Sequence, residues 1–222
     1  MNRLLTIAVV TSLVLGTACN ANSEKQKNKP NSPKPAADIS WVPAGLEVAL
    51  FAGGCFWCME PPFDQVKGVV KTTSGYTDGF VPNPAYLAVA RGLTGHTEAV
   101  QVLYDPKLVK YSQLLTVFWN NIDPLSQDGQ FCDRGDQYRS GIYTYTTEQN
   151  RSARASFAEL GRNPLFKGKI TTEVKAATRF YPAEEYHQNF YLKKPGHYKR
   201  YRKGCGRDQR LKILWTPANE RD

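Results

Sequence analysis

The sequence predicts an α+β fold built around a mixed β-sheet, and two observations lead to this class. Runs typical of strands and runs typical of helices follow one another irregularly, and no segment is repeated. The chain has 222 residues, of which 41% are hydrophobic and 22% charged, so it can bury one substantial core. We therefore expect one folded domain in which helices pack on a sheet.

The elements of this domain can be placed from apolar periodicity. The expected strands are Leu46–Phe51, Val69–Thr73, Thr94–Tyr104, Ser140–Thr146 and Ile170–Ala176. The expected helices are a segment around Phe63–Val66, then Ser112–Ile122, Glu148–Leu160 and Ala183–Leu192.

Three stretches depart from these patterns. Pro61 and Pro62 interrupt the first helical segment, so that helix should begin near Pro61 or be irregular before it. Asp123–Arg139 is a long loop rich in aromatic and ionic side chains, which favours a functional loop over a disordered one. No periodic element follows Lys194, and we expect an irregular, flexible C-terminal tail there.

The amino terminus is typical of an exported protein. Residues 1–18 form a predicted signal peptide, because the apolar run Leu4–Leu15 is too short to span a bilayer. The run leads into Leu15-Gly16-Thr17-Ala18-Cys19, which resembles a bacterial lipobox with Cys19 as the lipidated residue. Ordinary cleavage after Ala21 is the alternative. We expect a lipoprotein of the bacterial cell envelope, either facing the periplasm or on the outer surface.

Composition divides the remainder into three parts. Residues 19–43 are polar and rich in Lys, Asn, Ser and Pro, which predicts a flexible linker. The folded domain is expected to cover 44–215, and 216–222 to form a disordered end. The net charge is +9, but its excess falls between Lys193 and Lys212. One basic terminal segment without a nucleic-acid motif favours a solvated or steering patch, so we expect no nucleic-acid partner.

The stretch Gly53-Gly54-Cys55-Phe56-Trp57-Cys58 is the first candidate site. It follows a strand that reads as buried, and a thiol placed directly after two glycines can be reached by backbone amides. Such amides would stabilise a thiolate, which is the reactive form of cysteine. The alternative is that Cys55 is a buried structural residue, as cysteines often are.

Glu98 is the second candidate. Period-2 alternation places it on the same strand face as Val100, Val102 and Tyr104. If that face is buried, the pKa of Glu98 rises and the side chain can donate a proton near neutral pH. The alternative is an exposed Glu at the end of the strand.

Two metal-site interpretations fit the sequence poorly. A structural zinc site usually uses two closely spaced ligand pairs, and Cys132 and Cys205 have no near partner in the sequence. His96-Thr97-Glu98 together with C-x-x-C resembles the zinc deaminases, but the order of the two motifs is reversed. We expect no metal.

Two cysteine chemistries remain open at this point. The pair Cys55 and Cys58 could belong to a thioredoxin-like thiol-disulfide oxidoreductase. Alternatively, Cys55 is a nucleophile toward a small polarised substrate with Glu98 as the acid. Cys205, placed between two glycines in the tail, would then be a mobile resolving thiol.

Six motifs, in the same order along the chain, resemble one known family. They are Gly54-Cys55-Phe56-Trp57, Ser74-Gly75-Tyr76, Asn83-Pro84-Ala85-Tyr86, Gly95-His96-Thr97-Glu98-Ala99-Val100, Gln137-Tyr138-Arg139-Ser140 and Glu184-Glu185-Tyr186-His187. The sequence from about Leu46 to beyond Cys205 closely resembles the peptide methionine sulfoxide reductase A family. The resemblance implies a two-layer sandwich with a ferredoxin-like core. It also implies reduction of the S epimer of methionine sulfoxide, free or in proteins.

The resemblance also implies roles for individual residues. Cys55 would attack the sulfoxide sulfur and become a sulfenic acid, while Glu98 protonates the oxygen. Tyr86 and Tyr138 would hydrogen-bond that oxygen.

Substrate binding is implied in the same way. Phe56 and Trp57 would hold the methyl group, and Asp133 would anchor the polar part of the substrate. No bound cofactor is implied, and a thioredoxin-type donor would supply the electrons. We expect a monomer.

Two residues are candidates for the resolving thiol, because Cys58 stands where the family often has Gly. We favour Cys205 over Cys58, since two thiols so close in sequence would need an irregular turn at Pro61 to reach disulfide geometry. Cys132 has no place in the family pattern and is expected to have no role.

Overall fold

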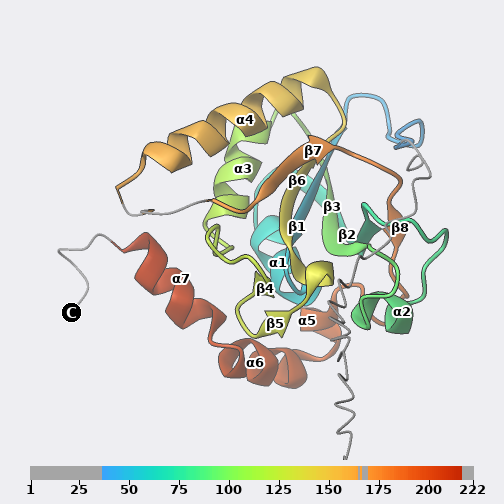
Figure 1. Ribbon diagram of the computed structural model, residues 1–222. Coiled ribbons are helices and arrows are strands. Elements are labelled where there is room, and N and C mark those ends of the chain that lie inside the picture. Colours follow the sequence, from blue (N-terminus) through green and yellow to red (C-terminus); the bar gives the residue numbers. More distant parts are fainter. Residues whose placement is uncertain (1–36, 165, 167–169, 217–222) are drawn as a thin grey trace, which may run out of the picture. The chain divides into compact units, whose positions relative to one another are not determined.

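The computed structural model describes residues 37–164, 166 and 170–216 (Figure 1). The predicted signal peptide, Cys19, most of the predicted linker and residues 217–222 of the predicted disordered end lie outside this range.

A six-stranded mixed sheet forms the centre of the described domain, in the order β7-β6-β1-β3-β2-β8. Its strands are β1 (Glu47–Gly53), β2 (Val69–Thr77), β3 (Thr97–Tyr104), β6 (Ser140–Thr144), β7 (Glu173–Ala176) and β8 (Tyr181–Pro182). Neighbouring strands are antiparallel except β6 and β7, which are parallel. The four inner strands follow the ferredoxin-like order and confirm the expected α+β class.

Three helices cover one face of this sheet (Figure 1). They are α1 (Phe56–Asp64), α3 (Tyr111–Trp119) and α4 (Thr147–Arg162). Phe51 of β1 stacks on Phe63 and Phe118, with ring centroids 5.0 and 5.3 Å apart, and so joins strand to helices. Aromatic stacking adds to the burial of apolar area at this contact. At the start of α4, the Thr146 hydroxyl accepts a hydrogen bond from the Gln149 amide.

The strands alternate between two faces as their sequences predict. Leu50 and Ala52 point to the second face, where they meet Tyr143 in a smaller cluster. On β3, Val100 and Val102 lie in the main core on the helical side. The predicted core face of this strand is therefore confirmed.

Short elements organise the loops between strands. They are α2 (Tyr86–Ala90), β4 (Gly129–Gln130), β5 (Asp133–Arg134) and the 3-10 helix η1 (Asp136–Tyr138). β4 and β5 pair with each other, so the long loop 123–139 is an ordered structure.

Helix α1 begins earlier than the prolines predict. It starts at Phe56 and continues through Pro61 and Pro62, so the expected irregularity before Pro61 is wrong. Pro62 has no amide N–H for the carbonyl of Cys58, one helical turn earlier. Arg202 Nη1 donates to that carbonyl at 3.3 Å instead.

The expected irregular tail is wrong, because the chain after Lys194 is helical. The final elements are α5 (Phe190–Lys193), α6 (Pro195–Gly204) and α7 (Arg207–Trp215), and the predicted helix 183–192 is replaced by turns that lead into α5. Pro195 occupies the first turn of α6, where its fixed φ is favourable. Gly206, at φ +68°, lets the chain turn into α7. Periodicity missed α6 because it buries no residue of its own.

None of the helices within the described ranges is both long enough and apolar enough to cross a membrane.

Candidate active site

Cys55 stands at the joint between β1 and α1. Its position depends on two glycines at which a side chain would crowd neighbouring atoms. A Cβ on Gly53 would lie 2.6 Å from Met59 Sδ, and one on Gly54, which has φ +79°, would lie 2.5 Å from Gln130 Cβ. Cys55 is the N-cap residue of α1 and only 6% exposed, so its thiol lies at the positive end of the helix dipole.

Glu98 lies on the neighbouring strand β3 and is directly joined to this helix terminus. Its Oε2 accepts a hydrogen bond from the Phe56 amide at 3.0 Å. The residue is 2% exposed, and burial raises the pKa of Glu98 to about 8, with the charges of Asp133 and Cys58 adding to the shift. Glu98 is therefore an acid that carries its proton at neutral pH, as its strand face predicts.

Tyr86 and Tyr138 reach the same place from different elements. Tyr86 opens α2, and its ring packs on His187 with centroids 4.3 Å apart. Burial raises the pKa of Tyr86 to about 12, with further contributions from Glu98 and Cys55. Tyr138 ends η1. Burial raises the pKa of Tyr138, and the charges of Glu98 and Tyr86 raise it further. Both hydroxyls therefore remain protonated donors beside the acid and the thiol.

Phe56 and Trp57 form apolar walls, although α5 and α6 cover part of them. Phe56 is buried against the rings of Tyr76 and His187. Trp57 stacks on Phe190 at 3.8 Å and donates from Nε1 to His187 Nδ1 at 3.0 Å.

Tyr201 of α6 reaches over the thiol, and the sequence analysis did not single it out. Its hydroxyl lies 2.6 Å from both carboxylate oxygens of Asp133. Burial and hydrogen-bonding contact with Cys55 and Asp133 raise the pKa of Tyr201. Burial also raises the pKa of Asp133, against the lowering effect of the Tyr201 hydrogen bond. Asp133 is thus at the site, but engaged with α6.

The other cysteines are arranged differently from expectation. Cys132 and Cys205 form a disulfide, with S–S 2.06 Å and Cα–Cα 4.9 Å, so the prediction that Cys132 has no role is wrong. Cys205 ends α6 and is held by this bond; it does not swing freely in a flexible tail. Cys55 and Cys58 are free and buried.

A hydrogen bond links the thiols of Cys55 and Cys58, so the pKa of each depends on the other. Burial, together with the hydrogen bond to Cys58, raises the pKa of Cys55. The same hydrogen bond lowers the pKa of Cys58 to about 7 against the effect of burial, and the positive charges of Arg207 and Arg202 lower it further. These opposite directions make Cys58 the more acidic thiol of the pair.

Arg207 is the second residue that sequence reasoning missed. It is 1% exposed, and its Nη2 donates to the Gly53 carbonyl at 2.6 Å while Nη1 donates to the Asn121 carbonyl at 3.1 Å. Its guanidinium also lies over the Phe131 ring, 4.3 Å from the centroid. A buried cation is thereby fixed beneath the cysteine loop.

Within the described ranges, one group of side chains has the donor types of a metal site: Cys132, Asp133 and Cys205. Its two sulfurs are bonded to each other, so they cannot serve as thiolate ligands in this state.

The site combines a thiol pair at a helix terminus, a protonated buried carboxyl group and two tyrosine hydroxyls. These are the parts needed to attack an electrophile with sulfur and to protonate an oxygen that leaves. They define a thiol-dependent oxidoreductase.

Comparison with known proteins gives the family. Residues 47–219 match the family model described as peptide methionine sulfoxide reductase. A peptide methionine sulfoxide reductase MsrA of Bacillus pumilus is 48% identical over 170 residues, which cover 77% of this chain and 96% of that protein. One of Bacillus subtilis is 49% identical over 169 residues, 76% of this chain and 96% of that protein. The chain belongs to the peptide methionine sulfoxide reductase family and is an enzyme of that class.

Solved structures agree with this assignment. Reduced Mxr1 of Saccharomyces cerevisiae superposes with a TM-score of 0.64 at 31% identity, covering 69% of this chain and 88% of that one. Methionine sulfoxide reductase A of Corynebacterium diphtheriae gives 0.61 at 34% identity, with 73% and 84% covered. The family assignment favours sulfoxide reduction over the thioredoxin-like alternative for Cys55 and Cys58.

The thiol pair leads to a spectroscopic prediction. As pH rises through about 7, ultraviolet absorbance should report one thiolate in the chain with the Cys132–Cys205 disulfide intact. Cys58→Ser should remove this step, because the pKa of the remaining Cys55 is raised by burial. Loss of the step in Cys55→Ser but not in Cys58→Ser would place the thiolate on Cys55 and contradict the prediction.

Proposed function

We propose that this enzyme reduces the S epimer of methionine sulfoxide, free or within proteins, with Cys55 as nucleophile and Glu98 as acid. The observation that carries the assignment is the protonated, buried Glu98 bonded to the helix terminus that holds Cys55. A sulfoxide oxygen leaves poorly unless it is protonated, so the acid and the nucleophile must act at adjacent atoms.

The first step transfers the oxygen. The sulfur of Cys55 forms a bond to the sulfoxide sulfur while Glu98 delivers a proton to the oxygen. The resulting hydroxyl group then passes to the Cys55 sulfur, as the bonds from the substrate sulfur to Cys55 and to oxygen both break. Methionine leaves, and Cys55 becomes a sulfenic acid. The hydroxyls of Tyr86 and Tyr138 donate hydrogen bonds to the oxygen as negative charge develops on it.

Substrate entry requires α6 to move. Cys55 is nearly buried. The Tyr201 hydroxyl donates a hydrogen bond to the Asp133 carboxylate, and Tyr201 also contacts Cys55. When Tyr201 withdraws, the Asp133 carboxylate can accept a hydrogen bond from the backbone N–H of the substrate. Trp57 then offers its ring to the methyl group.

Three further thiols return Cys55 to its thiol form and carry the oxidation to a second pair of cysteines. The Cys58 thiolate attacks the sulfenic sulfur, which gives a Cys55–Cys58 disulfide and releases hydroxide, and the hydroxide takes up a proton to become water. Thiolate exchange by Cys205 on Cys58 frees Cys55, and attack by Cys132 on Cys205 then frees Cys58. The product of this sequence is the Cys132–Cys205 disulfide.

This order makes Cys58 the resolving thiol in place of Cys205, which the sequence analysis favoured, and the positions of the sulfurs support the change. Cys58 lies in hydrogen-bonding contact with Cys55, whereas Cys205 is bonded to Cys132. Cys132 is exposed, so an external dithiol can reach its sulfur. A thioredoxin-type donor acting on a monomer would supply the two electrons.

The nucleophile and the acid can be tested with a chiral methyl sulfoxide. Cys55→Ser should abolish reduction, and Glu98→Gln should lower the single-turnover rate by roughly 10²-fold or more. In the parent, the rate should fall as pH rises past about 8, because Glu98 then loses its proton. That decline should be absent in Glu98→Gln. Retained activity in Cys55→Ser, or equal rates for both epimers, would contradict the proposal.

The order of the thiols can be read by mass spectrometry after one turnover of prereduced enzyme without reductant. Cys58→Ser should accumulate the sulfenic acid on Cys55. Cys205→Ser and Cys132→Ser should instead accumulate a disulfide that contains Cys58. A sulfenic acid that persists in Cys205→Ser but not in Cys58→Ser would make Cys205 the resolving thiol.

We also propose that Cys19 is lipidated and anchors the enzyme in the cell envelope, on the basis of the apolar run and the lipobox-like residues that precede it. Cells that express the chain and are fed a labelled fatty acid should label this protein, and Cys19→Ala should lose the label. An unlabelled mature form that begins after Ala21 would show ordinary secretion.

A further inference from the structure

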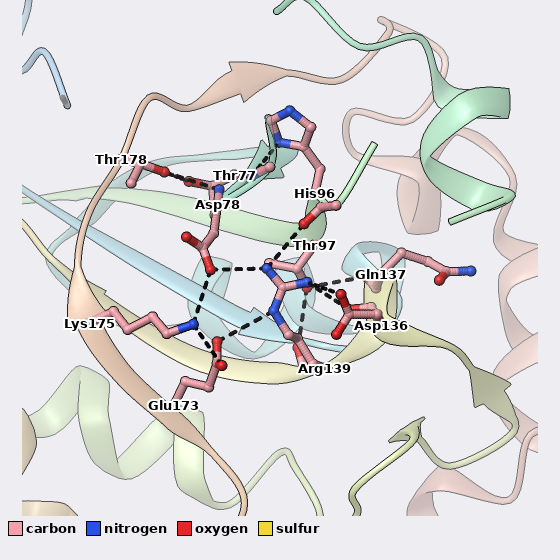
Figure 2. A network of polar contacts seen from close by, with 12 residues as sticks. Thr77, Asp78, His96, Thr97, Asp136, Gln137, Arg139, Glu173, Lys175 and Thr178 are labelled. Carbon is pink, nitrogen blue, oxygen red and sulfur yellow. Dashed lines mark hydrogen bonds and ion pairs between the residues drawn. The ribbon is translucent and has the colours of Figure 1, made fainter. Parts of the chain in front are cut away.

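A network of charged and polar groups surrounds Arg139, the residue that follows Tyr138 (Figure 2). The Arg139 side chain is 13% exposed and donates in several directions. Its partners are Asp78 Oδ2 at 3.1 Å, the Gly95 carbonyl at 3.3 Å, the Asp136 carbonyl at 2.8 Å and Glu173 Oε2 at 3.4 Å. A rigid guanidinium held at several points fixes the backbone that carries it.

These partners come from the strands beside the site. Asp78 follows β2, Gly95 precedes β3, and Glu173 begins β7. The Asp78 side chain is 4% exposed, so its charge requires compensation, and Lys175 Nζ contributes to this at 3.3 Å. Arg139 thus ties the end of η1 to the strand ends near Glu98.

Thr97 strengthens the same connection from the side of β3 (Figure 2). Its hydroxyl lies 3.2 Å from the Gln137 carbonyl and 3.2 Å from the Arg139 carbonyl, on either side of Tyr138. Thr97 directly precedes Glu98 in β3. The backbone on both sides of Tyr138 is therefore held against the residue before the acid.

Gln137 connects this turn to α2, the helix that carries the Tyr86 hydroxyl. Its Nε2 donates to the Ala90 carbonyl at 2.8 Å, at the end of the helix that Tyr86 begins. The tripeptide Gln137-Tyr138-Arg139 thus joins the elements that carry Glu98, Tyr86 and Tyr138. None of the described contacts of Arg139 is with Cys55 or Glu98, so its guanidinium would act on the reaction through the turn that it anchors.

We propose that Arg139 is a positioning residue for oxygen transfer: it holds Tyr138 where the hydroxyl meets the sulfoxide oxygen beside Glu98. This inference rests on the proposed function of the site and assigns Arg139 a part in it. Hydrogen bonds to developing charge act only from a fixed position, and a small displacement of the donor lowers the rate of the chemical step. Binding of the ground-state substrate depends on other groups.

The test is single-turnover reduction of a methyl sulfoxide by prereduced enzyme, without added reductant, over a range of substrate concentrations. Arg139→Lys keeps the positive charge but loses the planar guanidinium group and its fixed set of N–H donors. Its maximal rate should fall about tenfold or more, while half-saturation stays within about threefold of the parent. Thermal unfolding of each variant, measured in parallel, confirms that the assays use folded protein.

A double-mutant cycle separates positioning from general loosening of the fold. If Arg139 acts through Tyr138, then Arg139→Lys should lower the rate less than about threefold in a Tyr138→Phe background. Lys175→Met is the matched control, because the described contacts of the Lys175 ammonium include Asp78 and Glu173 but no residue of η1. This variant should retain the maximal rate of the parent within about twofold.

Three outcomes would overturn the inference while sulfoxide reduction by the parent stands. They are a parental rate in Arg139→Lys, a loss confined to half-saturation, and an equal loss in the Tyr138→Phe background. If Arg139→Lys does not fold, Arg139→Gln takes its place, and its maximal rate should fall while half-saturation is kept. A parental rate in that variant also overturns the inference. A parent that reduces no sulfoxide overturns both this inference and the proposed function.

Discussion

The hydrogen bond between the Phe56 amide and Glu98 is the interaction on which the site depends. It joins a helix terminus to the neighbouring strand β3, and therefore brings a nucleophile and an acid from distant parts of the sequence into one buried volume. Burial alone would favour two neutral groups, a thiol and a carboxylic acid. The helix terminus and the Arg207 guanidinium supply positive potential to the sulfurs, while the carboxyl group keeps its proton. Acid and thiolate can thus coexist near pH 7.

The surrounding fold gives this contact its precision. The register of β1 and β3 sets where Glu98 faces the end of β1, and the two glycines allow the chain to turn into α1 without displacing Met59 or Gln130. The tyrosines come from loops, and loops need anchors to serve as fixed donors. The Tyr86 amide donates a hydrogen bond to the Glu184 carboxylate. Tyr138 lies between two residues whose backbone carbonyls accept hydrogen bonds from the Thr97 hydroxyl.

Local sequence patterns predicted the five longer strands and made Glu98 a candidate acid. Alternation on β3 placed Glu98 on the core face, and the Gly-Gly-Cys stretch after an apolar run placed the nucleophile at the end of a buried strand. Tyr86, Tyr138 and Asp133 required the family resemblance, because nothing in their immediate sequence indicates that their side chains converge.

The C-terminal helices escaped prediction for a physical reason. α6 buries no residue of its own, and the buried face of α7 begins with the charged Arg207 before Leu211 and Leu214, so the apolar pattern on which periodicity depends is absent or short. The Cys132–Cys205 disulfide joins residues 73 positions apart, and no local spacing reveals such a pair. The prolines of α1 misled for a related reason: the donor that compensates for the missing N–H of Pro62 is Arg202, far along the chain.

The residues proposed for the chemical step and those of the helical C-terminal segment lie in separate parts of the sequence. The proposed nucleophile, acid and oxygen-binding hydroxyls lie at or before residue 138, whereas Tyr201, Arg202, Cys205 and Arg207 lie in α6, at its end and in α7. The first group determines which bond of the substrate is broken. The second group influences access to Cys55, the charge of the Cys58 thiol and the transfer of electrons from the donor. Changes in α6 and α7 could therefore adapt the enzyme to a different electron donor or a bulkier protein substrate while the bond-breaking machinery stays the same.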